Sequence, residues 1–186
     1  MGKSTAALGW QKLGASIVDT DDLARHLLRK GSAVLLELRN RFGDGLVDGE
    51  GCLIRSRLAD LIFDDSAARA QVQALLHPRI REMWLETVCG WRSSAVKLGV
   101  VIIPLLYETG VEGVFDAVAV AASSEAAQLS RIRERGWTPL ELERRSRAQL
   151  SAEEKIRRGD FVLWNESTVE VLLEQITCVN HTLLSV

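Results

Sequence analysis

Hydrophobic residues recur along the chain in two patterns. In longer segments they stand three and four positions apart, which is the spacing of an amphipathic helix. In shorter segments they form unbroken, often β-branched runs, which is typical of strands buried on both faces. The first pattern predicts helices over residues 3–13, 22–30, 32–42, 55–63, 66–90, 124–135, 139–149 and 168–184.

The strongest apolar run holds Val100, Val101, Ile102 and Ile103, and Pro104 closes it. Strands that are buried on both faces and separated by helices indicate a parallel sheet in a doubly wound α/β fold. Such folds usually begin with a strand, whereas this sequence begins with a helix. The predicted strands cover residues 15–18, 97–103, 117–121 and 161–164.

The composition is that of a globular protein. The 186 residues suit one domain, with 47% hydrophobic and 26% charged residues. No stretch approaches the ~20 apolar residues of a membrane span, and no apolar signal segment follows the first residues. Cys52, Cys89 and Cys178 match no zinc or redox spacing, so we expect buried thiols in a reducing compartment. These features favour a cytoplasmic protein.

Charge is unevenly distributed along the chain. The net charge is −2, which does not favour nucleic acid as a partner. Residues 131–158 nevertheless carry nine Lys or Arg and five Asp or Glu, an excess of four positive charges, which leaves −6 for the remainder. The six arginines at 131, 133, 135, 144, 145 and 147, with Gly136 and Pro139 marking a hinge, favour a mobile lid that clamps phosphates. The simpler alternative is a set of solvated helix faces.

The opening residues Gly2, Lys3, Ser4 and Thr5 lead directly into a helix and match the second half of a phosphate-binding loop. In that motif backbone N–H groups and the helix dipole hold the phosphates. Lys3 would neutralise the β- and γ-phosphates, and the Ser4 hydroxyl would hold Mg²⁺. Alone, four residues are a weak signal, since such a match also occurs by chance.

Two acids, Asp19 and Asp21, follow the first predicted strand. A carboxylate at the carboxyl end of a strand faces the ligand crevice of an α/β sheet, where it can position or deprotonate an acceptor hydroxyl. The alternative is an N-cap cluster for the next helix. One acid can cap while the other does chemistry, and we expect Asp21 to be the base.

Several segments together resemble one family, although each alone is not specific. They agree in order and spacing over essentially the whole chain with the dephospho-CoA kinase family. The segments are Gly-Lys-Ser-Thr at 2–5, Asp-Thr-Asp-Asp-Leu-Ala-Arg at 19–25, Leu-Leu-His-Pro-Arg-Ile-Arg at 75–81, the run 100–110, the arginine-rich stretch 128–149 and Gly-Asp-Phe-Val-Leu-Trp-Asn at 159–165.

The resemblance implies ATP-dependent phosphorylation of the ribose 3′-hydroxyl of dephospho-CoA, which gives coenzyme A and ADP in the last step of CoA synthesis. It implies an α/β, P-loop NTPase-type three-layer fold with a parallel sheet, as a single domain over 1–186. Within that domain we expect a helical CoA-side subdomain at about 32–91 and a helical lid at about 128–158. The implied ligands are ATP, Mg²⁺ and dephospho-CoA, without nucleic acid or membrane, in a monomer or weak homo-oligomer.

The resemblance also assigns candidate site residues. We expect Pro78 to break helix 66–90 and so to expose His77, but the simpler alternative is that Pro78 marks a helix start. For Glu108 the simpler alternative is an ordinary acidic residue in a turn. The candidates are Lys3, Asp21 and Arg135 for catalysis, Gly2, Lys3, Ser4, Thr5, Arg131, Arg145 and Gln149 for ATP, Asp21, His77, Arg81 and Glu108 for the acceptor, and Ser4 for the metal.

The sequence departs from the family at its front end. The first strand and the start of the phosphate loop are missing, so the strands at 97–103 and 117–121 are expected to face a gap at the centre of the sheet. We expect a misassigned start codon, while a fragment and an inactive relative remain alternatives. Other possible functions are a nucleoside monophosphate kinase and a nucleotide-binding module without catalysis. The five tryptophans, at 10, 84, 91, 137 and 164, are expected to be packing residues.

Overall fold

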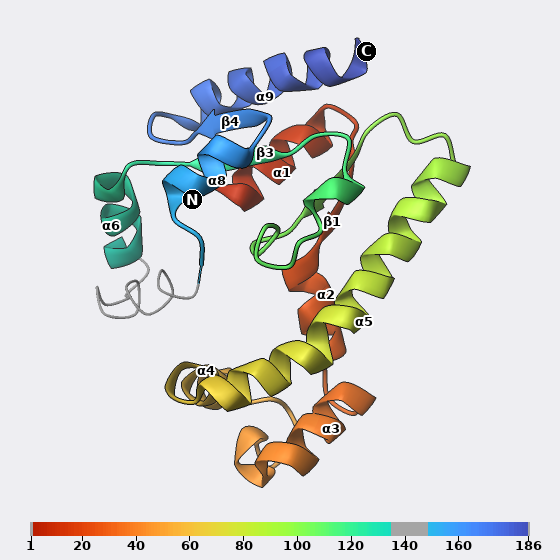
Figure 1. Ribbon diagram of the computed structural model, residues 1–186, viewed down its shortest axis with the longest axis vertical. Helices are drawn as coiled ribbons and strands as arrows, with labels where there is room; N and C mark the ends of the chain where they lie inside the picture. The colour runs from red at the N-terminus through yellow and green to blue at the C-terminus, as the bar shows by residue number, and fades with distance from the viewer. Residues whose placement is uncertain (1, 135–148, 186) are drawn as a thin grey trace. The chain divides into compact units, whose positions relative to one another are not determined.

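The computed structural model describes residues 2–134 and 149–185, without the side chains of 131–134. The chain divides into two compact units, which are described here one at a time. Unit 1 comprises Met1–Ile17 and Val96–Val186, and unit 2 comprises Val18–Ala95 (Figure 1). The predicted elements that lie in the described residues are present in the predicted order.

Unit 1 combines short strands with helices. Strand β1, which leads into unit 2, is hydrogen-bonded to β2, and β3 pairs with β4 in parallel, with Ala119 opposite Phe161. The elements are α1 (Lys3–Lys12), β1 (Ser16–Asp19), β2 (Gly99–Ile102), the 3₁₀ turn η2 (Glu112–Val114), β3 (Ala119–Ala122), α6 (Glu125–Glu134), α8 (Ala152–Arg158), β4 (Phe161–Trp164) and α9 (Val169–Leu184). Helix α8 was not predicted as a separate element.

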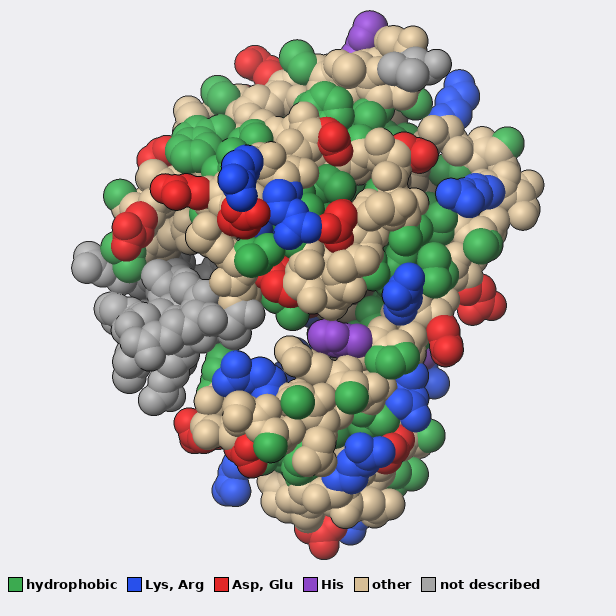
Figure 2. Space-filling model, in the orientation of Figure 1, with side chains coloured by type: hydrophobic (Ala, Val, Ile, Leu, Met, Phe, Trp, Pro, Cys, Tyr) green, Lys and Arg blue, Asp and Glu red, His purple; other side chains and the backbone are tan. Residues whose placement is uncertain are grey.

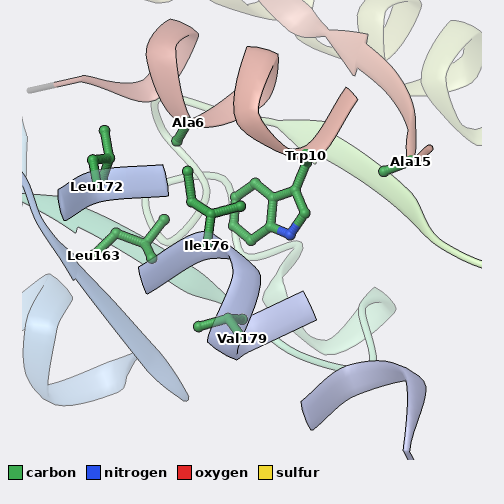
Figure 3. Packing of buried hydrophobic residues seen from close by; sticks show 7 residues of the cluster. All are labelled: Ala6, Trp10, Ala15, Leu163, Leu172, Ile176 and Val179. Carbon is green, nitrogen blue, oxygen red and sulfur yellow. The ribbon is translucent and has the colours of Figure 1, made fainter. Parts of the chain in front are cut away.

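The core of unit 1 is built where α1 and α9 pack together next to β4. Trp10 of α1 and Ile176 of α9 point toward each other, and Leu163 of β4 lies beside them (Figure 3). The two helices approach closely at Gly9, since a Cβ there would come within 2.8 Å of Ile176 Cδ1. Apolar burial of this kind is the main force that holds α1 in place.

The strands of unit 1 form two separate two-stranded sheets. Among the described strands, β2 pairs only with β1 and β3 only with β4. A cavity of about 240 Å³ lies between residues 98–104 and 115–121, and its lining is mostly apolar. The strands were predicted to be buried on both faces, which is wrong for most of β2 and β3. Their side chains are mainly half-buried, because none of the strands in residues 2–134 and 149–185 covers the side that faces the cavity.

Unit 2 is helical. Its core is closed, with Leu38, Val72 and Leu75 buried by the surrounding helices. Helix α5 is the longest, and α2, α3 and α4 all pack on it. The elements are α2 (Thr20–Leu27), α3 (Ala33–Phe42), the 3₁₀ turn η1 (Asp44–Leu46), α4 (Arg55–Asp64) and α5 (Ser66–Ser93).

Side-chain caps fix where three helices of unit 2 begin. Asp19 accepts from the backbone N–H of Asp21 at 2.8 Å, and Ser32 accepts from Leu35 at 3.1 Å. Asp65 accepts from the first turn of α5. Each cap satisfies N–H groups that have no partner within the helix. The capping role proposed for Asp19 is therefore confirmed.

Helix α5 runs through Pro78 without a break, so the predicted interruption is wrong. Proline removes one N–H from a helix, which costs free energy but need not end it when packing holds both sides. Here Leu75 lies in the core and Leu76 packs against it just before the proline, and the Arg79 guanidinium donates to the Leu75 carbonyl at 2.8 Å. Tertiary packing therefore outweighs the local preference.

Two further predictions are corrected. The thiols were expected to be buried, but Cys89 and Cys178 are exposed and Cys52 is half-buried, since their helix or loop positions face away from the cores. Trp10 and Trp84 are packing residues as predicted, whereas Trp164 is 44% exposed on the outer side of β4. Trp137 and most of the predicted helix 139–149 lie outside the described residues.

The surface carries charged side chains of both signs and several exposed large hydrophobic ones, among them Leu8 and Leu36. On the face shown in Figure 2, acidic and basic side chains are interspersed with one another. Among the described residues, no helix is both long and apolar enough to cross a lipid bilayer.

Candidate phosphate and acceptor site

Helix α1 begins directly after a glycine, Gly2. Gly2 adopts a left-handed backbone with φ +85°, and a Cβ at this position would clash with the side-chain amide of Asn165. No acidic residue lies in the first turn of α1, so its N-terminal N–H groups and dipole favour an anion. Glycine is required here for two independent reasons, backbone conformation and space.

Lys3 and Ser4 follow in that same turn. Lys3 is half-buried and lines the cavity next to β2, and Ser4 is exposed. Thr5 is half-buried behind them. An ammonium group and a hydroxyl at the start of a helix can serve a polyphosphate, the first by charge and the second as an oxygen ligand.

Glu108, which follows β2, lies at the centre of a junction. Its Oε1 accepts from Lys155 Nζ of α8 at 2.9 Å and from the backbone N–H of Leu150 at 2.9 Å. Lys155 Nζ also donates to Gln149 Oε1 at 3.4 Å. The structure therefore brings two predicted site residues, Glu108 and Gln149, onto one lysine.

The Glu108 carboxylate is electrostatically held in its charged form. Although Glu108 as a whole residue is exposed, its side chain is only 18% exposed and that of Lys155 is 15% exposed. Burial alone raises the pKa of Glu108, but the hydrogen bonds from Lys155 and Leu150 outweigh burial and leave the pKa below its usual value.

A second contact of α8 supports the same loop. Arg158 forms an ion pair with Glu112 and its guanidinium lies 4.3 Å from the centre of the Tyr107 ring. Tyr107 is buried, and burial raises the pKa of its hydroxyl. Lys155 and Arg158 are three positions apart on one face of α8, so both reach the segment that follows β2.

Asp21, His77 and Arg81 belong to unit 2. Asp21 lies in the first turn of α2 and is exposed. Helix α2 packs on α5, which carries His77 and, one turn later, the exposed Arg81. The two helices of unit 2 therefore carry a carboxylate, an imidazole and a guanidinium.

His77 is half-buried, and burial lowers its pKa. At neutral pH it is therefore an uncharged hydrogen-bonding group. Its neighbour Arg79 is a structural residue, since its guanidinium lies 3.2 Å from Glu37 of α3 and also contacts the backbone of α5.

The arginines proposed for the phosphates are only partly described. The backbone of Arg131 lies in α6, and nothing is described of its side chain. Arg135 and Arg145 lie outside the described residues. Their assigned roles remain predictions.

Two residues near the site were not singled out from the sequence. Lys155 is one of the nine basic residues in the stretch 131–158, and its burial against Glu108 distinguishes it. Asn165 belonged to a family-like segment without an assigned role. Its position directly after strand β4 was the available signal, because such positions lie at the ligand edge of α/β sheets.

Among the described residues, no group of three or more His, Cys, Asp or Glu is arranged to hold a metal ion. Ser4 supplies one exposed oxygen. That fits Mg²⁺, which commonly keeps several waters and takes most other ligands from substrate phosphates rather than from a protein cage.

Comparison with known proteins identifies the family. The family model for dephospho-CoA kinase matches residues 1–170. Curated dephospho-CoA kinases include that of Geobacter sulfurreducens, 35% identical over 94% of this chain and 89% of its own length. That of Anaeromyxobacter dehalogenans is 36% identical over 92% of this chain and 82% of its own length.

Solved structures agree with the sequence comparison. A Thermus thermophilus protein has a TM-score of 0.79 at 31% identity and covers 97% of this chain and 91% of its own. The dephospho-CoA kinase of Campylobacter jejuni has a TM-score of 0.72 at 25% identity over 99% and 92%. The predicted α/β fold of the P-loop NTPase type is confirmed, and the chain belongs to the dephospho-CoA kinase family.

Proposed function

We propose that this protein transfers the γ-phosphoryl group of ATP to the 3′-hydroxyl of the ribose of dephospho-CoA, giving coenzyme A and ADP. The observation that carries the proposal is the start of α1, where Gly2 in a left-handed conformation leads into Lys3 and Ser4 in a member of this family. The curated relatives bear the same activity in their names.

The phosphate end of the reaction is served by α1. Its first N–H groups and its dipole bind the phosphate oxygens, and the Lys3 ammonium balances the charge that develops on the leaving ADP. Ser4 would hold Mg²⁺, which supplies further charge neutralisation on the phosphates when bound. Gly2 and Thr5 shape the turn around them.

The acceptor end is assigned to unit 2. The ribose 3′-oxygen attacks the γ-phosphorus, the bond to the ADP oxygen breaks, and Asp21 takes the hydroxyl proton. Asp21 is suited to this because it is exposed in the first turn of α2, while the neighbouring Asp19 provides the cap. His77 and Arg81 would bind the acceptor, the first as a neutral donor or acceptor and the second by charge.

Glu108 and the arginines complete the proposed site. Glu108 would orient the acceptor from the loop after β2, and Gln149 would contact ATP. Arg131, Arg135 and Arg145 would bind phosphates, because guanidinium groups form two-pronged hydrogen bonds with phosphate oxygens. Arg135 is assigned to the transferred group, where charge changes most.

The test is ADP release from MgATP with dephospho-CoA as acceptor, compared with a panel of nucleoside monophosphates. We expect turnover with dephospho-CoA and with none of the other acceptors. The substitution Lys3→Met should lower this turnover by about 10²-fold or more. Asp21→Asn should lower kcat with little change in the KM for ATP.

Lys12→Met is the matched control, because Lys12 is an exposed lysine at the other end of α1. Turnover of a nucleoside monophosphate in place of dephospho-CoA would overturn the acceptor assignment. Binding of both ligands without ADP release would instead support a nucleotide-binding protein without catalysis.

A further inference from the structure

The junction around Lys155 has features that an ordinary surface ion pair lacks. The side chains of Lys155 and Glu108 are 15% and 18% exposed. One carboxylate oxygen of Glu108 accepts two hydrogen bonds, from Lys155 Nζ and from the Leu150 N–H. Such a buried, doubly bonded carboxylate is held in one position, whereas an exposed pair samples many. By contrast, the nearby pair Arg157 and Glu154 has an arginine that is 77% exposed.

The junction joins segments that are far apart in the sequence. Glu108 follows β2, whereas Gln149, Leu150 and Lys155 lie in and before α8. The Arg158 contacts with Tyr107 and Glu112 bind α8 to the same loop, one turn further along the helix. After α8, Asp160 accepts from the Val118 N–H at 2.8 Å. Helix α8 is thus anchored at several points, and Lys155 is the anchor that contacts the proposed ligand-binding residues.

We propose that Lys155 is a positioning residue that holds Glu108 for the acceptor and Gln149 for ATP in one fixed arrangement. The proposal rests on the proposed function, which assigns those two residues to the two ligands. Lys155 acts through them, and neither ligand need touch it. Its removal should therefore weaken both ligands at once.

The hydrogen bonds of Lys155 indicate which substitution at this position should preserve the junction. Arginine can replace both hydrogen bonds of Lys155, since its guanidinium carries several N–H donors. Methionine keeps much of the apolar stem of lysine, which lines the cavity, but loses the charge and the donors. A comparison of these two variants separates the loss of the ammonium group from a loss of packing.

The experiment measures Kd for dephospho-CoA and for ATP by calorimetry with the wild type, Lys155→Met, Lys155→Arg and the control Arg157→Met. Loss of a charged hydrogen bond that positions each ligand-binding side chain predicts about tenfold weaker binding of both ligands in Lys155→Met. Lys155→Arg should recover most of that loss, and Arg157→Met should bind as the wild type does. Unchanged binding in Lys155→Met would overturn the proposal.

Two readouts without ligand keep the test independent of the proposed function. In Lys155→Met the pKa of the Glu108 carboxyl, followed by carbon NMR, should rise, and the Leu150 amide should exchange about tenfold faster. If the wild type bound neither ligand, the proposed function would be wrong. The two readouts would still test whether Lys155 positions Glu108 and the Leu150 amide. An unchanged Glu108 pKa and Leu150 exchange rate would show that Lys155 positions nothing. If Lys155→Met does not fold, Lys155→Gln takes its place.

Discussion

The two units differ in how completely they bury their apolar residues. In unit 2 the helices enclose a closed core, in which Leu38 is 0% exposed and Val72 and Leu75 are each 4% exposed. In unit 1 the β-branched residues of β2 stay half-buried beside a cavity of about 240 Å³. A helix makes most of its backbone hydrogen bonds internally, so it does not need a neighbouring strand to complete them. A strand depends on neighbours on both sides, so one gap in the sheet leaves both flanking strands incompletely covered.

The largest expected effect comes from filling that gap. Five apolar residues and a glycine-rich loop, added directly before Gly2, should occupy the cavity and place further N–H groups around the phosphates. We expect turnover to rise by about 10²-fold or more. The measurement is ADP release from MgATP with dephospho-CoA, combined with hydrogen exchange of the β2 and β3 amides.

A glycine and serine segment of the same length is the control for that addition. It lacks side chains to fill the cavity and should change neither readout. If the apolar addition left exchange in β2 and β3 unchanged, the cavity would not accept a strand and the comparison of the two units would lose its basis.

Two leucine-to-alanine substitutions, one in each unit, test the same comparison. Leu38→Ala in the closed core should lower the free energy of unfolding by about 2–5 kcal/mol. Leu106→Ala, at a half-buried leucine that lines the cavity, should cost about 1 kcal/mol or less, because fewer contacts are lost. Urea denaturation of both variants gives the two values, and equal losses would contradict the difference in packing.

Helix caps offer a smaller contrast. Asp65→Ala removes a side chain that accepts from two N–H groups of α5, and should cost about 0.5–2 kcal/mol. Thr168, the corresponding residue of α9, makes no side-chain cap hydrogen bond. Thr168→Ala should therefore change the free energy of unfolding by only a few tenths of a kcal/mol. Thermal unfolding of the two variants measures both changes in stability. A loss of stability in Thr168→Ala as large as that in Asp65→Ala would argue against the cap hydrogen bonds as the cause.

The smallest expected effect is the pH response of His77. Burial lowers its pKa in the folded protein, so the unfolded chain binds the proton first as the pH falls. The stability that the neutral imidazole allows is complete above about pH 6.5, the ordinary value, and decreases as the pH falls toward the lower folded pKa. His77→Gln should flatten the decline in unfolding free energy between about pH 7.5 and 5.5. An identical decline in both proteins would exclude His77 as its source.

Much of the fold was predictable because its signals are local. Apolar spacing located the described helices other than α8, and Asp19 and Ser32 marked where α2 and α3 begin, since a capping side chain bonds to N–H groups two or three residues away. The prediction for Pro78 failed for the opposite reason. The local rule was sound, but the packing of Leu75 and Leu76 in the core of unit 2 keeps α5 continuous.

By itself the sequence determined the order of the strands and of most described helices, the glycine that precedes α1 and the resemblance to the dephospho-CoA kinase family, because residue type and spacing carry that information. Only the tertiary structure decided that Lys155 is bonded to Glu108 and Gln149, that Asn165 lies against Gly2, and that β2 and β3 flank a cavity. These contacts join residues many positions apart. They depend on which elements pack together, and no local pattern encodes that.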